Sequence, residues 1–200
     1  MISPLEVRRQ IIHLLSGVIL AFLVYIQILN KVSVVILYLI GWFICIRCKH
    51  ERIPMVYSFL RYFEREEDLE KFPGKGALFY LLGTALVVIL FPLDIAVASI
   101  LILAFGDSIS HIVGRFGSIK HPFNSKKFLE GSVAGAIMAF IAAYIILGDP
   151  FEAGIGAVLG MFLEGFNMEH KGKKIDDNVI VPLAAAVGIW LIRLILRYPF

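Results

Sequence analysis

The sequence predicts an all-α protein, a polytopic bundle of about seven membrane-spanning helices with one further amphipathic helix at the membrane surface. Of the 200 residues, 59% are hydrophobic and only 18% are charged, whereas a soluble domain of this length carries about a quarter charged residues. The mean hydropathy is +0.84. Apolar runs recur along the chain, separated by short polar stretches, without an internal repeat. We therefore expect one integral-membrane domain over residues 1–200.

The apolar runs define the predicted helices, because roughly 20 apolar residues cross the hydrocarbon layer. The first run follows Arg8 and Arg9, as in a signal peptide, but no small-x-small cleavage site follows it, so we expect a retained helix. Cys45 and Cys48 have no second pair to complete a zinc site and are interpreted as buried thiols, with a redox pair as the alternative. The predicted spans are about 11–29, 32–48, 77–92, 94–113, 130–148, 152–166 and 179–197.

The stretch 50–72 has the pattern of an amphipathic helix. Met55, Phe59 and Phe63 recur at helical spacing, and charges of both signs fill the other face. This pattern is typical of a helix that lies along the inner membrane surface. We interpret it as an anchor, and the alternative is a wall that guides a lipid substrate towards a site.

The basic residues predict the orientation in the membrane. Seven spans place the termini on opposite sides, and with the N-terminus in the cytoplasm all but three of the 19 lysines and arginines lie on the inner side. The net charge of +3 is too small to indicate a nucleic-acid partner. We expect an integral membrane protein whose site faces the cytoplasm. The three outer basic residues are Lys31, Arg193 and Arg197.

Carboxylates inside predicted spans are informative, because each costs a few kcal/mol, about 3 on insertion scales, unless it faces a partner, water or a metal. Asp107 shares a face of the fourth span with Ser110, His111 and Gly114. Glu164 shares a face with two glycines that let a neighbouring helix approach, which turns the acid into the bundle. Further polar groups near the cytoplasmic ends of other helices converge with these on one predicted site: His13, Glu130, Asp176, Asp177 and Asn178.

Simpler structural roles stay open for part of this set. One of Asp176, Asp177 and Asn178 is expected to be the N-cap of the last helix, and capping alone would explain Asp177 or Asn178. His13 is also consistent with helix packing near the interface. For Asp107 and Glu164 a functional role is favoured, because helix packing rarely needs a buried carboxylate.

A basic, glycine-containing loop follows the fourth span and suits a polyphosphate. Carboxylates, water and phosphate oxygens form the usual shell of Mg²⁺, and arginine, lysine and the amino end of a helix expected near Ser125 suit phosphate oxygens. No G-x-x-x-x-G-K-[ST] P-loop is present. These residues indicate a membrane enzyme that handles a phosphate ester with a divalent metal. The candidate phosphate-binding residues are Arg115, Lys120, Lys126, Lys127, Gly114 and Gly117.

Four short motifs occur in order: Gly-Asp at 106–107, Gly-Arg-Phe-Gly at 114–117, "KKFLEG" at 126–131 and "DDNVIVP" at 176–182. This arrangement closely resembles the core of the polyprenol kinase family, which includes dolichol kinases, phytol kinases and CTP-dependent diacylglycerol kinases. The early stretches "RRQIIHLLSG" and "KGALFYLLG" also resemble family segments, so the likeness spans most of the chain.

The resemblance implies transfer of the γ-phosphoryl group of CTP to the hydroxyl of a membrane lipid alcohol, such as a polyprenol, phytol or a diradylglycerol. Catalysis in such a reaction is mainly positioning and charge stabilisation. On this basis the basic loop and Asn178 are assigned to the nucleotide or its metal. The catalytic candidates are Asp107, Glu130, Asp177 and His13, and the candidate ligands of Mg²⁺ are Asp107, Glu164 and Asp177, with the base among them left open.

Two other functions are compatible with part of the pattern. CDP-diacylglycerol synthases share the Gly-Asp and Gly-Arg-x-Phe-Gly motifs, but this chain has "NSKKFLEG" without the family's proline and lacks its closing Pro-Gly-His-Gly-Gly…Asp-Arg segment. A small transporter would also carry buried carboxylates. It would place ionisable groups near mid-bilayer, whereas here they gather on one side.

Overall fold

The computed structural model describes residues 3–166, 169–170 and 173–197. Lys171, one of the predicted inner basic residues, lies outside this part of the chain. The helices are α1 (Pro4–Tyr25), α2 (Lys31–Glu51), α3 (Pro54–Phe63), α4 (Glu66–Lys71), α5 (Lys75–Leu90), α6 (Leu93–Gly114), α7 (Leu129–Leu147), α8 (Pro150–Glu164) and α9 (Asp177–Arg197). The strands are β1 (Lys120–His121), β2 (Asn124–Phe128), β3 (Glu169–His170) and β4 (Lys173–Lys174).

The predicted all-α membrane bundle is confirmed. In the part of the chain that the structure describes, five helices are long and apolar enough to cross a membrane, namely α1, α2, α6, α7 and α9. The helices α5 and α8 match the third and sixth predicted spans but have only 16 and 15 residues. The number of seven crossings therefore stays a prediction. The protein is an integral membrane protein on the strength of these apolar helices.

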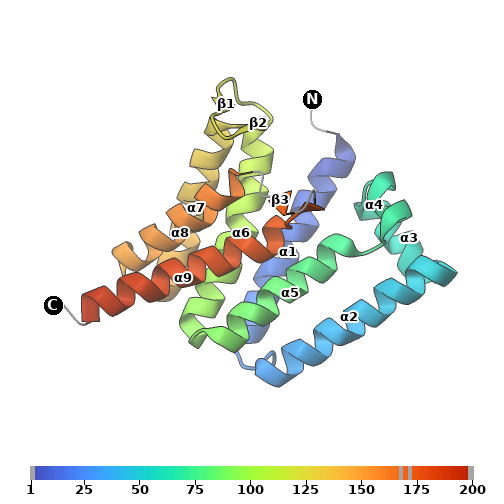
Figure 1. Cartoon of the computed structure of the whole chain (residues 1–200), viewed down its shortest axis with the longest axis horizontal. Coiled ribbons are helices and arrows are strands. Elements are labelled where there is room, and N and C mark those ends of the chain that lie inside the picture. The colour runs from blue at the N-terminus through green and yellow to red at the C-terminus, as the bar shows by residue number, and fades with distance from the viewer. Residues whose placement is uncertain (1–2, 167–168, 171–172, 198–200) are drawn as a thin grey trace.

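Helix α6 is the centre of the bundle. It packs against α1, α7, α8 and α9 (Figure 1), and 72% of its most apolar window is buried, against 17% for α2. Close approach of α7 depends on glycine: a Cβ atom at Gly131 would lie 2.7 Å from the Cα of Gly114, and one at Gly135 would lie 2.6 Å from the carbonyl oxygen of Gly106. Gly131 and Gly135 therefore let α7 pack closely against α6.

Side chains cap several helices and so fix where they begin. Ser3 accepts the amide of Glu6 at the start of α1 (3.2 Å), and Asp149 accepts two amides at the start of α8. At α9 the carboxylate of Asp176 accepts the amide of Asn178 (3.2 Å). Asp176 is one of the three residues expected to cap this helix, and it takes that role in place of Asp177 or Asn178.

The predicted amphipathic stretch 50–72 is divided into α3 and α4, with a break at Glu64, whose backbone is extended. Met55 on α3 is 84% exposed and carries the apolar face outwards. The stretch is fastened to the first turns of α1, because Arg65 forms an ion pair with Glu6 (2.9 Å). Burial raises the pKa of the Glu64 carboxyl, although Gly74 donates an amide hydrogen bond to it (3.0 Å).

Residues 120–128 form an antiparallel hairpin of β1 and β2 at the shared end of α6 and α7 (Figure 1). The helix that we expected near Ser125 is therefore wrong, and α7 begins only at Leu129. Successive side chains of a strand point to opposite faces. In β2, Lys126 is therefore exposed, whereas the side chain of Lys127 is 16% exposed and points into the bundle.

Candidate functional site

Asp107 is the centre of a buried polar cluster in the last turns of α6. It is 8% exposed. Its Oδ1 atom lies 3.4 Å from Nε2 of His111, one helical turn further along α6. Its Oδ2 atom lies 3.4 Å from Nε2 of His13 on α1. Asp107 is therefore held between two imidazoles that belong to different helices.

Glu164 forms the second part of the cluster, at the last residue of α8. Its side chain is 0% exposed. Its Oε1 atom accepts hydrogen bonds from Ser110 Oγ (3.0 Å) and from Lys127 Nζ (2.5 Å). Lys127 Nζ also donates to the backbone carbonyl of Glu164 and lies 3.9 Å from Oδ2 of Asp177 at the start of α9. Lys127 therefore connects the β1–β2 hairpin with α8 and α9.

The structure thus brings together most of the predicted acidic site. His13, Asp107, Lys127, Glu164 and Asp177 come from five elements of the chain and lie in one network of contacts. Asp107 and Glu164 are linked through α6, because Ser110, which contacts Glu164, lies on the face of α6 that carries Asp107.

Glu130 lies at a different place from these carboxylates. Its Oε1 atom accepts the amides of Ser118 (2.7 Å) and Ile119 (3.0 Å), so Glu130 fixes the turn that leads from α6 into the hairpin. Gly117 in the same turn has no room for a side chain, since a Cβ atom there would lie 2.8 Å from Oε2 of Glu130. Among the described residues, Glu130 and Gly117 shape the loop and do not contact the buried acids.

The other predicted phosphate-binding residues lie around this turn. Arg115 and Lys126 are exposed. Lys120 is directed back onto the hairpin, where Nζ donates to the carbonyl of Ser125 (3.1 Å). Asn178 connects the start of α9 with the start of α5, because Nδ2 donates to the carbonyl of Gly76 (3.3 Å). Gly114 packs against Gly131 at the crossing of α6 and α7.

Sequence reasoning assigned no role to two residues that contact Asp107 or His13. The spacing of four residues predicted that His111 lies on the same face as Asp107. In the structure, Nε2 of His111 lies 3.4 Å from Asp107, so the two side chains form a pair. Tyr80 on α5 stacks on the ring of His13, with ring centroids 4.6 Å apart and an angle of 18° between the planes. No local sequence pattern predicts the role of Tyr80, because its contact with His13 joins two apolar helices that are distant in the sequence.

The cluster is suited to a cation. Ligand atoms of Asp107, His111 and Glu164 all lie within 4.8 Å of one another. Glu164 is fully buried, and its Oε2 atom has no hydrogen-bond partner among the described residues. A buried carboxylate oxygen without a donor is costly, and a metal ion would satisfy it. Asp177, also a predicted metal ligand, reaches this group through Lys127.

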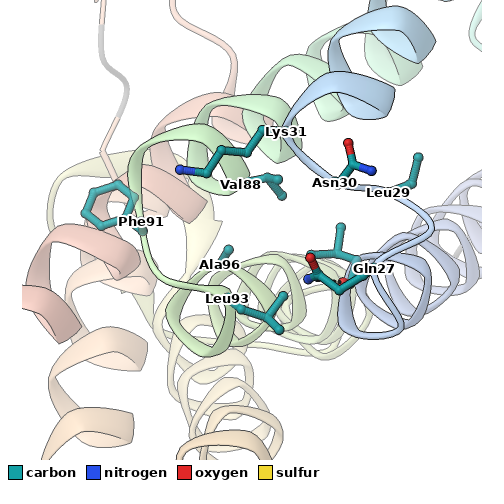
Figure 2. A pocket seen from close by; sticks show the side chains of 9 residues that line it. Gln27, Leu29, Asn30, Lys31, Val88, Phe91, Leu93 and Ala96 are labelled. Atoms are coloured by element: carbon teal, nitrogen blue, oxygen red, sulfur yellow. Dashed lines mark hydrogen bonds between the residues drawn. The ribbon is translucent and has the colours of Figure 1, made fainter.

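A cavity of about 330 Å³ lies where α1 ends and α6 begins, at the end of the bundle away from the polar cluster. Figure 2 shows Lys31 and Phe91 on one side of it and Gln27 on the other. Asp107 and His111 lie at the far end of α6 from Leu93 and Ala96, which line this cavity. The cavity is therefore separate from the polar cluster.

The fold and the cluster together define a class: a membrane-embedded helical protein with acids, imidazoles and a lysine gathered where several helices begin or end. Comparison with known proteins narrows this class. The chain is 32% identical to an uncharacterized protein of Methanocaldococcus jannaschii over 90% of this chain and 91% of that protein. No protein-family model and no solved structure matches it.

Named relatives give the family. The chain is 31% identical to a probable chloroplastic phytol kinase of Triticum aestivum, over 69% of this chain and 49% of that protein. It is 27% identical to the CTP-dependent diacylglycerol kinase 1 of Schizosaccharomyces pombe, over 62% of this chain and 63% of that protein. The chain thus spans about half to two thirds of these two named relatives. It belongs to the polyprenol kinase family, a family of alcohol phosphotransferases.

Proposed function

We propose that the protein is a CTP-dependent lipid kinase that phosphorylates the hydroxyl group of a membrane isoprenoid or glycerolipid alcohol. The observation that carries this proposal is the placement of Asp107 between two imidazoles, next to a buried Lys127–Glu164 pair. The names of the relatives support both the acceptor class and the nucleotide. The acceptor class is an alcohol of the polyprenol, phytol or diradylglycerol type.

In the proposed step, the oxygen of the lipid hydroxyl attacks the γ-phosphorus atom of CTP. A new bond forms between that oxygen and the γ-phosphorus, and the bond from the γ-phosphorus to the β–γ bridging oxygen breaks. CDP leaves, and the hydroxyl proton passes to a base of the protein. Because the transition state of such transfers is loose, positioning and charge stabilisation dominate catalysis.

The base in this proposal is the pair of Asp107 and His13. Oδ2 of Asp107 faces Nε2 of His13, and the stack on Tyr80 holds the imidazole in place. A carboxylate that orients an imidazole in this way gives a positioned proton acceptor. The exposed residues Ile11 and Leu15 lie on the opposite face of α1, so His13 faces the interior of the bundle with Asp107. We propose that the hydroxyl of the alcohol reaches this pair from the bilayer.

The nucleotide is held from the side of the hairpin. Lys127 is directed into the cluster, Arg115 is exposed where α6 ends, and Lys126 is exposed on the other face of β2. The proposed position of the triphosphate is between the turn and the buried acids. Glu130 and Gly117 position the turn, and Lys120 and Asn178 stabilise the hairpin and the start of α9. A divalent cation held by Asp107 and Glu164, with Asp177 beside them, would neutralise charge on the phosphate oxygens.

We place this site at the cytoplasmic face, with the N-terminus in the cytoplasm. The basic residues support this orientation, because Arg115 and Lys126 flank the cluster and the positive-inside bias assigns them to the cytoplasm. The nucleotide then arrives from water and the alcohol from the bilayer. The two substrates meet where α6 and α8 end.

Transfer from CTP labelled at one phosphorus atom at a time tests the proposal directly. The purified protein is incubated in lipid vesicles with Mg²⁺, a panel of lipid alcohols and CTP labelled at either the α- or the γ-phosphorus. We expect γ-label in the lipid, with CDP as the second product. Label from the α position with release of pyrophosphate would identify a CDP-diacylglycerol synthase-like enzyme instead. No label from either position would contradict both enzymes and favour the small-transporter alternative.

A further inference from the structure

We infer that Asp107, His111 and Glu164 form a cation site with one nitrogen and two carboxylate donors, and that the Lys127 ammonium competes with the cation for the carboxylate of Glu164. The inference deepens the proposed function, because it rests on the cation proposed there. It adds His111 as a ligand, a preference among metals, and a lysine that competes with the metal.

The donor atoms come from rigid elements. Asp107 and His111 are four residues apart on α6, so their side chains share one face and keep a fixed relative position. Glu164 comes from the end of α8 and is held towards α6 by Ser110. One ligand atom from each of the three residues lies within 4.8 Å of the other two. A small shift of these side chains would bring all three donors onto one ion.

The buried oxygen of Glu164 is the second, independent indication. Glu164 is 0% exposed, and within the described part of the chain its Oε2 atom has no partner, whereas Oε1 accepts bonds from both Ser110 and Lys127. Buried polar atoms in folded proteins are almost always satisfied. Packing alone does not require a carboxylate here. An ion between Glu164 and Asp107 would complete the coordination of this oxygen.

The donor set favours one group of metals over another. Mg²⁺ and Ca²⁺ prefer all-oxygen surroundings, whereas an imidazole nitrogen suits first-row transition metals. His111 has its Nε2 atom directed at Asp107, inside the proposed site. A set of one imidazole and two carboxylates therefore selects Mn²⁺, which accepts oxygen and nitrogen donors, over Mg²⁺.

Lys127 shares the carboxylate of Glu164 with the proposed cation. Its ammonium contacts Oε1 and the backbone carbonyl of Glu164 and lies 3.9 Å from Asp177, whereas the cation would bind Oε2. An ammonium and a divalent cation on the two oxygens of one carboxylate repel each other. Binding of the cation therefore displaces Lys127 from Glu164. The displaced ammonium would then be free to contact a phosphate group.

Metal binding without nucleotide tests the ligand set. Electron paramagnetic resonance of free Mn²⁺, titrated with purified protein, measures affinity, and competition with Mg²⁺ measures selectivity. We expect Mn²⁺ to bind at least about tenfold more tightly than Mg²⁺, and His111→Ala to weaken Mn²⁺ binding roughly tenfold or more. The matched control is His50→Ala, because His50 is exposed at the end of α2. Equal loss in both variants, or no loss in His111→Ala, would overturn the inference.

Substitution of Lys127 shows whether this lysine competes with the cation or only stabilises the structure, because the two roles change Mn²⁺ affinity in different directions. Removal of the competing ammonium in Lys127→Met should raise Mn²⁺ affinity by about tenfold or more, because the cation then displaces nothing. A purely structural lysine would leave the affinity unchanged or lower it. If Lys127→Met does not fold, Lys127→Gln keeps hydrogen-bonding capacity without charge, and the same increase is expected. Unchanged or lower affinity in the folded variant contradicts the competition.

Failure of this inference and failure of the proposed function give different results. Lipid phosphorylation combined with Mn²⁺ binding that does not respond to His111→Ala would overturn the inferred ligand set and leave the kinase intact. Binding of Mn²⁺ that depends on His111, without transfer to any alcohol, would support the cation site and contradict the kinase.

Discussion

Tyr80 controls the geometry of His13 at the scale of a single side chain. The two rings stack at 4.6 Å, and Tyr80 is buried between α1 and α6. The phenol oxygen has no hydrogen-bond partner among the described residues. The aromatic ring therefore supplies the contact that positions His13, and the hydroxyl supplies little.

We expect Tyr80→Phe to keep the stack and to match or slightly exceed the wild type in stability, because it removes a buried hydroxyl without a partner. Tyr80→Ala should lower the free energy of unfolding by about 3–5 kcal/mol, as other large aromatic truncations do, and should lose transfer activity. Thermal unfolding in detergent and a phosphorylation assay measure the two effects. Equal damage from both substitutions would show that the hydroxyl, not the ring, is needed.

Neighbouring lysines show where sequence reasoning stops at this scale. Lys126 and Lys127 were assigned to phosphate together, as cations of one basic loop. In the strand β2 they point to opposite faces, so only Lys127 reaches Glu164. Charge and residue type were readable from the sequence, but the direction of each side chain depends on a five-residue strand with no periodic signal of its own.

Among the elements, the turn from α6 to β1 has the tightest geometry near the site. Glu130, on the first turn of α7, accepts two amides of the turn, and Gly117 lies against it. A side chain at Gly117 would meet the Cβ atom of Phe128 at 2.6 Å. The turn therefore has one conformation in which the hairpin and α7 fit together.

Gly117→Ala should shift the hairpin and lower the transfer rate by roughly 10- to 100-fold, because misplacement of about 1 Å has effects of that size. The matched control is Gly154→Ala on α8, where a Cβ atom meets nothing within 4 Å. This control should keep full activity and gain up to about 1 kcal/mol of stability from helix propensity. Steady-state rates for the two variants provide the measurement. Equal rates would contradict the fixed turn.

The long apolar elements were predictable, and the short polar ones were not. Each predicted span has a helix in the structure, because a run of apolar residues in lipid has no alternative that satisfies its backbone. The sequence left three candidates for the cap of α9, of which the structure has Asp176, and the stretch 50–72 breaks at Glu64. These details depend on tertiary contacts such as Arg65 with Glu6, which local pattern does not encode.

At the scale of the whole molecule, ion pairs fasten α8 and α9 at both ends. At the end with the cluster, Lys127 contacts Glu164 and Asp177. At the other end, Arg193 on α9 binds Glu152 on α8 (2.8 Å from Nε to Oε1) and Asp94 on α6 (2.7 Å). The distant ion pairs hold the helices whose opposite ends carry the site.

Arg193→Leu leaves Glu152 buried without its partner and should lower the free energy of unfolding by about 3–5 kcal/mol. The expected KM for nucleotide stays unchanged at temperatures where the variant is folded, because the pair is remote from the cluster. Arg47→Leu removes an exposed pair with Glu51 and should cost less than about 1 kcal/mol. Thermal unfolding compares the variants. A small effect in Arg193→Leu would contradict a stabilising role for the distant pair.

The orientation of the bundle is testable with matched cysteines. In a cysteine-free background, Ile119→Cys and Ile28→Cys place thiols at turn positions that are 59% and 60% exposed at opposite ends of the molecule. We expect an impermeant maleimide added to intact cells to label only Ile28→Cys, and Ile119→Cys to react only after the membrane is opened. The reverse pattern would place the cluster on the outer face and contradict a site fed with cytoplasmic nucleotide.

The central claim is that the buried carboxylate of Asp107 takes part in phosphoryl transfer. Its most direct test is the rate of transfer from γ-labelled CTP to lipid by purified Asp107→Asn, which keeps the shape of the side chain and removes its charge. The account predicts loss of at least about 100-fold in rate, as for removal of a positioned acid–base group, while thermal unfolding still shows a folded protein. Transfer at the wild-type rate by the folded variant would contradict it.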